Sequence, residues 1–417
     1  MTLQPMPLEI LPMTSSSAAK AGISDLALFG GRPLLDRLLV VGRPNILNRD
    51  ALEQRLRGAM DRHWLTNDGP LVSELEERFA EWLDVPHCVA VNNATIGLQV
   101  VARALGITGE VLVPSFTFVG TAHAMQWLGL QPVFCDVLAD DHTLDPADVE
   151  RRIGPRTGAI LGVHLWGRAC QVEALQAIAD RHGIPLLLDA AHALGCGHAG
   201  RPLGLSGRAE VFSLHATKAL NSLEGGLVTT ADAELAQQVR LMRNFGFGGE
   251  DRVLSLGINA KMNEFCAAAG LSNLEGFEPL REHNRQIFEA YRSALDGLPG
   301  LRLHAPVPGQ QANHHYAVVE LAPDIAPGRD ALAELLRAEN VFARRYFRPG
   351  CHLSEPYVAT PQSLPVSERL SRSLLQLPTG LQLEVAEAAE LGRLIAWCLR
   401  NGPAIAERRQ AGTQPAR

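Results

Sequence analysis

The 417-residue chain lacks several features that would assign it to broad classes of protein. Its formal net charge of −7 gives no basic excess of the kind that nucleic-acid-binding proteins use. No apolar run reaches the roughly 18 residues of a membrane span, and no basic and apolar secretion signal is evident. Its seven cysteines form no CxxC pair, which favours reduced thiols over a disulfide framework or a zinc site. We therefore expect a cytoplasmic protein that binds neither nucleic acid nor membrane.

Lysine is almost missing from the chain. Of 38 basic residues only Lys20, Lys218 and Lys261 are lysines. Arginine stays protonated at any useful pH, whereas lysine can lose its proton and act as a nucleophile. A coding bias that replaces surface lysine by arginine makes the remaining lysines informative. Because Lys20 lies in a small, polar leader where we expect it to be solvated, Lys218 and Lys261 are the positions where an amine is needed.

Short apolar segments alternate with amphipathic ones from about residue 50 onward. The pattern predicts strands at 88–91, 111–113, 132–136, 159–164, 185–189, 211–213 and 227–230, separated mostly by helices such as 95–105, 121–128 and 172–182. This alternation is typical of an α/β fold with a mostly parallel sheet flanked by helices. In such sheets the chemistry lies at the carboxyl ends of the strands.

The composition changes after residue 300. A strand at 313–321 and helices at 329–339 and 385–399 indicate a smaller C-terminal α+β domain. We divide the chain into a flexible leader (1–25), a large domain (26–295), a small domain (296–405) and a disordered tail (406–417).

Two candidate residues follow the strand predicted at 185–189. Asp189 ends this apolar strand, where a carboxylate is costly to bury without a cationic partner. A protonated pyridine nitrogen is such a partner, and the pairing keeps the ring electron-poor. His192 could then hydrogen-bond the phenolic oxygen of that ring. The alternative is that Asp189 caps a helix and His192 is packed in the core.

Lys218 ends the segment Ser-Leu-His-Ala-Thr-Lys, which follows another predicted strand. Ser213, five residues earlier, could bind a phosphate. The turn 93–95 (Asn-Ala-Thr) joins a strand to a helix, where backbone N–H groups can approach a phosphate. Phe118 follows a strand and could stack on a pyridine ring. Taken alone, these features are more readily interpreted as a surface lysine, an ordinary helix cap and a core phenylalanine.

Two other motifs give no site. The glycine-rich segment 246–249 does not follow a strand with dinucleotide-binding spacing, so it does not support NAD binding. His314 and His315 have no accompanying ligand cluster, so we expect no metal.

The motifs in combination resemble one family, the nucleotide-sugar aminotransferases of pyridoxal-phosphate (PLP) fold type I, often called DegT/DnrJ/StrS. The resemblance runs in the family's order over roughly residues 30–400. The matching stretches are 64–70 (WLTNDGP), 93–95 (NAT), 114–118 (PSFTF), 163–167 (VHLWG), 189–192 (DAAH), 213–218 (SLHATK) and 259–264 (NAKMNE).

This resemblance implies a role for each candidate residue. Lys218 would hold PLP as a Schiff base, Asp189 would pair with its pyridine nitrogen, and His192 stands where the family has Gln or His near the phenolic oxygen. Lys261 stands where arginine is commoner, so it is interpreted as structural or substrate-contacting.

The remaining cofactor contacts also follow from the resemblance. Ala94, Thr95 and Ser213 would hold the phosphate, and Phe118 would stack on the ring. Asn259 would reach the phosphate bound in a neighbouring subunit, which implies a homodimer with shared active sites. The alternative for Asn259 is a turn residue after Gly257.

Further segments, among them 26–31 (LALFGG) and 343–347 (ARRYF), resemble the subgroup that acts on dTDP-4-keto-6-deoxyglucose. The implied reaction moves an amino group from glutamate to this ketosugar. Arg344, Arg345 and His352 are candidate contacts of the sugar nucleotide, or else solvated or interdomain residues. The alternatives are a cyclitol or other non-nucleotide aminotransferase, a dehydratase, and a non-catalytic protein on the same scaffold. Because the family's dehydratases replace the lysine by histidine, Lys218 argues against that branch.

Overall fold

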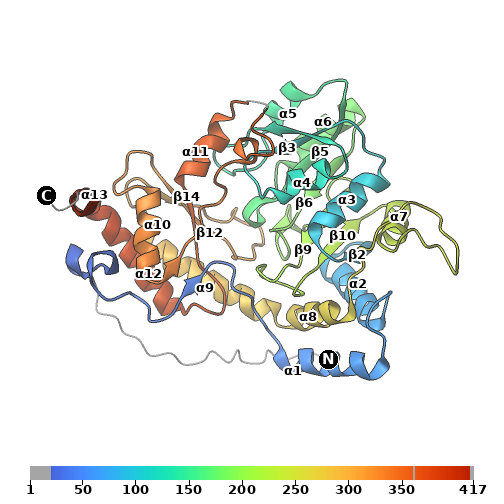
Figure 1. Ribbon diagram of the computed structural model, residues 1–417, viewed down its shortest axis with the longest axis horizontal. Helices are drawn as coiled ribbons and strands as arrows, with labels where there is room; N and C mark the ends of the chain where they lie inside the picture. Colours follow the sequence, from blue (N-terminus) through green and yellow to red (C-terminus); the bar gives the residue numbers. More distant parts are fainter. Residues whose placement is uncertain (1–19, 360–361, 414–417) are drawn as a thin grey trace.

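The computed structural model describes residues 20–359 and 362–413 (Figure 1). Its largest sheet has seven strands in the order β2-β10-β9-β6-β5-β3-β4. Only β10 is antiparallel to its neighbours, so the carboxyl ends of the other six strands share one edge. This confirms the predicted α/β class with a mostly parallel sheet. The strands are β2 (His87–Val91), β3 (Glu110–Pro114), β4 (Gln131–Cys135), β5 (Thr157–Val163), β6 (Leu186–Asp189), β9 (Ala209–Ser213) and β10 (Gly226–Thr230).

Helices cover both faces of this sheet because successive strand side chains point to opposite sides. On β3, Val111 and Val113 belong to the core under one set of helices, whereas Leu112 belongs to the core under another. The first set is α3 (Ala94–Ala104), α4 (Gly120–Gln126) and α7 (Ala233–Arg243). The opposite face packs against α5 (Pro146–Arg152) and α6 (Val172–His182), and, near β2, β10 and β9, against α2 (Pro70–Leu83) and α8 (Glu264–Glu275).

Several predicted elements coincide with observed ones, and others differ in detail. The helix at 172–182 is α6. After the last strand of this sheet and α7, two consecutive helices follow, α8 and α9 (Phe277–Leu295), separated at Gly276. Before the sheet, α1 (Arg49–Arg62) lies beside α8 (Figure 1). A small hairpin, β7 (Gly197–His198) with β8 (Arg201–Pro202), was not predicted.

The C-terminal part forms its own core on the left of Figure 1. Its sheet has the order β11-β12-β14, and both pairs are antiparallel. The elements are β11 (Leu301–Leu303), β12 (Ala317–Leu321), α10 (Arg329–Ala338), β13 (Val341–Phe342), α11 (Pro365–Ser373), β14 (Leu374–Leu377) and α12 (Val385–Arg400). Buried side chains of α9 join this core, so the helix connects the two parts of the molecule.

The N-terminal segment departs from the predicted division. Leu26 and Leu34 are buried in the C-terminal core, and β1 (Leu39–Val40) pairs in parallel with β13. Lys20, expected to be solvated, has its ammonium 3.0 Å from the carboxylate of Glu339 and is largely buried there. The composition of this segment predicted a flexible leader. Apolar burial and this ion pair instead hold it against the C-terminal part. Residues 1–19 of the predicted leader lie outside the described residues.

The predicted disordered tail also differs from the structure, because α13 (Gly402–Thr413) continues past residue 406. Ile405 is fully buried in the C-terminal core, and Arg409 pairs with Glu334 of α10. These contacts anchor a segment whose polar sequence suggested disorder. Residues 414–417 lie outside the described part. No helix within the described ranges is both long enough and apolar enough to cross a bilayer.

Candidate active site

A cavity of about 790 Å³ opens at the carboxyl edge of the large sheet. Its walls come from the turns that follow β2, β3, β6 and β9, and from the segment after β13 of the C-terminal part. This is the edge at which sheets of this type bind ligands. The predicted residues that line it are Ala94, Thr95, Phe118, Asp189, His192, Ser213 and Lys218. Seven of the eight predicted site residues therefore share one cavity.

Asp189 is a buried carboxylate at the end of β6. The hydroxyl of Thr121 donates to its Oδ2 over 2.7 Å, and the backbone N–H of Ala191 donates to its Oδ1 over 3.0 Å. Burial raises the pKa of Asp189, although these two donors and the Lys218 amine act to lower it. A buried carboxylate with a raised pKa lacks sufficient positive charge around it, and a protonated ring nitrogen would supply that charge.

The Lys218 amine shares the cavity with Asp189. Burial lowers the pKa of Lys218 to about 8, even though the Asp189 carboxylate acts to raise it. An amine with this pKa has a substantial neutral fraction near physiological pH, so it can act as a nucleophile or a base. This is the property that the scarcity of lysine suggested for this position.

His192 is held between aromatic rings. The ring of Tyr316 lies 4.4 Å from it, and that of Trp166 is stacked at 5.7 Å. Burial and the nearby Lys218 hold the pKa of His192 well below its usual value, so the ring is neutral. Its Nδ1 accepts the backbone N–H of Trp166 over 3.4 Å, which leaves the proton on Nε2. His192 can therefore donate one hydrogen bond to a cofactor oxygen.

The N-terminus of α3 and the end of β9 form one corner of the cavity. Asn93 caps α3 by accepting the N–H of Ile96 over 2.9 Å, and the first N–H groups of a helix have no partner within it. Gly226 lies so close that a Cβ there would stand 2.7 Å from the nitrogen of Ala94. With the Ser213 hydroxyl, this corner has the donors that a phosphate needs.

Phe118 is 58% exposed, unlike the core phenylalanine of the alternative interpretation. Its ring packs over Gly120, where an added Cβ would lie 3.0 Å from two ring carbons and 3.4 Å from the Thr95 hydroxyl. The glycine therefore allows the aromatic ring to lie beside the phosphate corner. An exposed ring at a cavity wall is available to stack on a planar ligand.

Asn259 and Lys261 do not line the cavity of their own chain. Asn259 is exposed and forms an isolated β-bridge with Asn244. Lys261 donates to the side-chain oxygen of Asn244 over 2.9 Å and lies 4.7 Å above the ring of Phe245. Within one chain, Lys261 therefore contacts Asn244 and Phe245 and has a structural role. Asn259 lies outside the cavity of its own chain.

The three candidate substrate contacts separate in the structure. Arg344 lines the cavity, whereas Arg345 lies outside it and pairs with Asp330 at 3.3 Å. His352 is buried elsewhere, with its Nδ1 2.5 Å from the Ser115 hydroxyl and its Nε2 3.6 Å from Glu368. His352 is thus one of the interdomain residues of the alternative interpretation.

Sequence reasoning missed residues that act through their neighbours. Thr121 is the second residue of α4, and no motif marks its bond to Asp189, which is 68 residues away. The indole N–H of Trp166 donates to Nδ1 of His142 over 3.2 Å. His142, His304 and Glu320 bring three potential metal ligands together. However, these side chains already have partners in the protein. Nδ1 of His142 accepts the indole N–H of Trp166, and Glu320 is paired with His304 and Arg369.

Comparison with known proteins agrees with this site. Residues 47–395 match the DegT/DnrJ/EryC1/StrS aminotransferase family. The dTDP-4-amino-4,6-dideoxy-D-glucose transaminase of Escherichia coli is 34% identical over 366 residues, which cover 86% of this chain and 98% of the relative. The dTDP-3-amino-3,4,6-trideoxy-alpha-D-glucose transaminase of Streptomyces venezuelae is 35% identical over 326 residues, covering 77% of this chain and 85% of the relative.

Solved structures show the same fold. The crystal structure of DesI in the presence of its TDP-sugar product superimposes with a TM-score of 0.90 at 46% identity, covering 93% of this chain and all of the other. DesV from S. venezuelae, in complex with a ketimine intermediate, gives a TM-score of 0.78 at 32% identity, with 85% and 98% covered. The architecture is therefore that of PLP fold type I.

The cavity also fits the cofactor of these enzymes. A lysine with a lowered pKa, a buried carboxylate that lacks a counter-charge and a helix N-terminus approached by Gly226 are the groups that PLP requires. The chain belongs to the DegT/DnrJ/EryC1/StrS aminotransferase family and is a PLP-dependent transaminase.

Proposed function

We propose that this protein transfers the amino group of glutamate to dTDP-4-keto-6-deoxyglucose and so forms the 4-amino-4,6-dideoxy sugar. The observation that carries the proposal is the meeting of Lys218 and Asp189 in one cavity of a chain so similar to sugar-nucleotide transaminases. The E. coli and Shigella dysenteriae relatives, at 34% and 32% identity, are named for a 4-amino-4,6-dideoxy sugar, which supports the 4-keto substrate.

We assign the cofactor contacts as follows. PLP, when bound, supplies an electron sink for the carbon that loses a proton. Lys218 would bind it covalently, and Asp189 would pair with its ring nitrogen. His192 would donate from Nε2 to the phenolic oxygen, and Phe118 would stack on the ring. Ala94, Thr95 and Ser213 would hold the phosphate.

Lys218 has a second task in this mechanism. When its amine is not bonded to the cofactor, Lys218 would take the proton from the donor's α-carbon and hold it for return within the same site. A pKa of about 8 suits both directions of this transfer. The same steps in reverse would aminate the ketosugar, so we expect ping-pong kinetics, in which 2-oxoglutarate leaves before the sugar binds.

The decisive experiment incubates the purified holoenzyme with glutamate and dTDP-4-keto-6-deoxyglucose and measures 2-oxoglutarate together with the mass of the sugar product. We expect stoichiometric oxoglutarate and amino sugar. A matched reaction with a 3-keto sugar nucleotide tests the activity for which the S. venezuelae relative is named. Turnover of a cyclitol ketone but of neither sugar nucleotide would favour the non-nucleotide alternative. No turnover of any of these ketones would overturn the proposed substrate.

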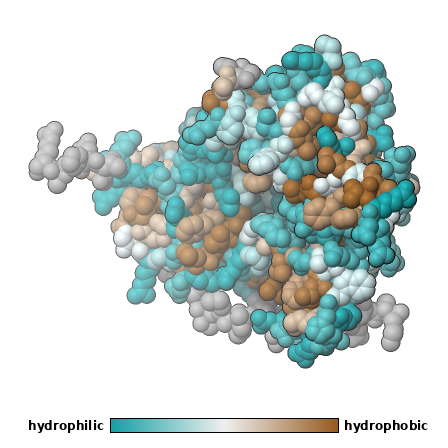
Figure 2. All heavy atoms as spheres, turned by 45° about the vertical axis from the view of Figure 1, so that its right-hand side comes forward, coloured by the Kyte–Doolittle hydropathy of each residue, from teal (hydrophilic) through white to brown (hydrophobic). Residues whose placement is uncertain are grey.

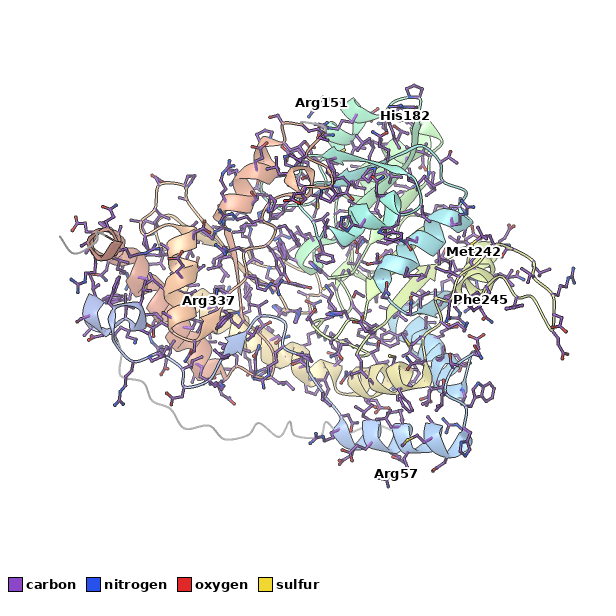
Figure 3. The ribbon with its side chains drawn as sticks, in the orientation of Figure 1. Arg57, Arg151, His182, Met242, Phe245 and Arg337 are labelled. Atoms are coloured by element: carbon purple, nitrogen blue, oxygen red, sulfur yellow. The ribbon has the colours of Figure 1, made fainter. Side chains whose placement is uncertain are left out.

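We further propose that the protein is a homodimer with shared active sites. Apolar side chains are exposed around Asn259, among them Val253 (62%) and Leu256 (69%). Phe245 is also exposed and lies on the same side of the molecule as α7 (Figure 3). The face turned forward in Figure 2 carries clusters of hydrophobic residues. Surfaces of this kind mark protein interfaces. A partner seated there could bring its Asn259 to the phosphate corner.

We also propose a cytoplasmic location. All seven cysteines are free thiols, and six of them are buried. A reducing compartment suits such a chain because nothing then drives these thiols into disulfides.

A further inference from the structure

Arg344 projects from a well-anchored backbone into the cofactor cavity. Its N–H donates to the carbonyl of Gln376 over 3.0 Å, and the Gln376 N–H donates back over 2.8 Å. This bridge attaches residue 344 to β14 of the C-terminal sheet. The side chain is exposed and lines the cavity whose other walls carry Lys218 and Asp189. Arg344 is thus a fixed point that the C-terminal part presents to the cofactor site.

Charge makes this arginine distinctive. Among the described residues that line the cavity, Lys218 is the only lysine and Arg344 the only arginine. In the proposed arrangement Lys218 is bonded to the cofactor, so Arg344 is the side chain that can bind an anion. The neighbouring Arg345 and Arg348 both pair with Asp330, at 3.3 and 2.6 Å. Within the described chain, Arg344 has no carboxylate in ion-pair distance.

An aromatic ring supports the guanidinium without consuming its donors. The guanidinium carbon of Arg344 lies 4.8 Å from the centre of the Tyr346 ring. Such a contact orients the planar group over the ring, while its N–H donors remain free in the plane. A guanidinium presented in this way can bind either a carboxylate or a phosphate through two oxygens at a time.

Arg344 also lines a second hollow, of about 580 Å³, with Val40, Phe342, Arg345, Arg348 and Pro349. Arg344 therefore lies between the cofactor cavity and this second hollow, which we call the outer groove. The wall of the outer groove includes Arg345 and Arg348. A ligand with its reacting carbon at Lys218 and a longer anionic part would pass Arg344.

We propose that Arg344 binds the anionic group of both substrates in turn: a carboxylate of the amino donor in the first half-reaction and the diphosphate of the sugar nucleotide in the second. This assignment rests on the proposed function. The two substrates never occupy the site together in a ping-pong reaction, so one guanidinium can serve both. The outer groove would then receive the nucleoside beyond the diphosphate.

The test compares Arg344→Gln and Arg344→Lys with a matched control, Arg337→Gln. Arg337 lies on α10, outside both hollows, and its guanidinium carbon is 5.1 Å from the Phe342 ring (Figure 3). The control therefore removes the same group from a similar aromatic contact, on a residue that itself lines neither hollow. Cofactor content and the visible absorption band verify that each variant is loaded and folded.

Three quantities are measured on each holoenzyme: the rate of the glutamate half-reaction against glutamate concentration, the rate of the ketosugar half-reaction against its concentration, and the dissociation constant of thymidine diphosphate by calorimetry. For Arg344→Gln we expect all three apparent affinities to fall by about tenfold to a hundredfold, as for a lost charge-assisted bond. Arg344→Lys should lose less, because it keeps the charge but not the planar fork. Arg337→Gln should match the wild type.

Each other outcome overturns the assignment in a distinct way. Unchanged affinities in Arg344→Gln would exclude the residue from substrate binding. A loss confined to glutamate, or confined to the sugar nucleotide and thymidine diphosphate, would overturn shared use. A wild-type enzyme that reacts with neither substrate would instead overturn the proposed function, and the assignment with it.

Discussion

The hydroxyl of Thr121 donates a 2.7 Å hydrogen bond to Oδ2 of Asp189, and both side chains are buried. The bond stabilises the ionised carboxylate and opposes the burial that raises its pKa. Asp189 remains a partner for a ring nitrogen only while it is ionised. Thr121, which touches no cofactor atom in the proposed arrangement, is therefore a positioning residue for the carboxylate that does.

Replacing Thr121 by valine should weaken the pairing of Asp189 with the cofactor. Loss of a bond to a charged group corresponds to about tenfold to a hundredfold in kcat. The variant should also change the pH dependence of the cofactor's visible absorption, which a merely structural defect would leave alone. Thr121→Ser keeps the hydroxyl and should restore both properties. A valine variant with wild-type kcat and an unchanged spectral titration would contradict this role.

Lys218→Ala should lose the visible band that borohydride reduction abolishes in the wild type, because no amine remains to bind the cofactor covalently. Transamination should fall by several orders of magnitude, since the same amine moves the proton. Lys261→Ala is the control, because Lys261 lies outside the cavity. A Lys218→Ala enzyme with full activity would sink the mechanism.

Formation of the holoenzyme should depend on pH through Lys218. The amine is protonated and unreactive below its pKa of about 8 and neutral above it. The rate at which apoenzyme captures PLP should therefore rise with pH, by about tenfold per unit well below pH 8, and level off above it. Stopped-flow absorbance with apoenzyme in excess measures this rate. A rate that is flat between pH 6 and 8 would show that the amine is already neutral there.

The phosphate corner should be sensitive to a single methyl group. In Gly226→Ala the new Cβ would stand 2.7 Å from the Ala94 nitrogen, so the start of α3 must move away from β10. We expect a higher dissociation constant for PLP, measured by the reconstitution of apoenzyme. Gly154→Ala adds the same atom where nothing lies within 4 Å and should bind PLP normally. Equal affinities for the two variants would exclude a tight approach at Gly226.

Sequence patterns selected residues that lie together in the candidate site because each pattern is local. A strand that ends in Asp189, a turn such as 93–95 and a lysine beyond a strand are each visible within a few residues, and a mostly parallel sheet brings such strand ends to one edge. The contacts that support them are not local. Thr121 meets Asp189 across 68 residues, and β1 pairs with β13 across about three-quarters of the chain, where no periodicity reports the partner.

The same limit explains the errors at the termini. The segments around Lys20 and after residue 406 are rich in small and polar residues, which in isolation favour disorder. They are ordered by distant partners, Glu339 for Lys20 and Glu334 for Arg409. Arg344 and Arg345 were both candidate substrate contacts because arginine binds anions. Only the fold distinguishes them, since Arg344 lines the cavity and Arg345 pairs with Asp330.

If the active site is shared between subunits, two inactive variants should complement each other in a mixed dimer. If Asn259 serves the partner's phosphate corner, Lys218→Ala and Asn259→Asp homodimers should both be nearly inactive, the second because a carboxylate would repel the phosphate. A heterodimer of the two contains one site with both native residues. Random exchange of subunits should therefore restore about a quarter of wild-type activity, since half the dimers are mixed and each carries one intact site.

Differently tagged chains, purified through both tags, provide the measurement. The doubly tagged fraction should hold the recovered activity, and each parent taken through the same exchange should remain inactive. Because Asn259 is exposed and lies outside the cavity of its own chain, its substitution should leave the fold of the monomer intact. Mixed dimers without activity would show that both residues act in the same site of one chain, whereas a fully active Asn259→Asp homodimer would remove this residue from cofactor binding altogether.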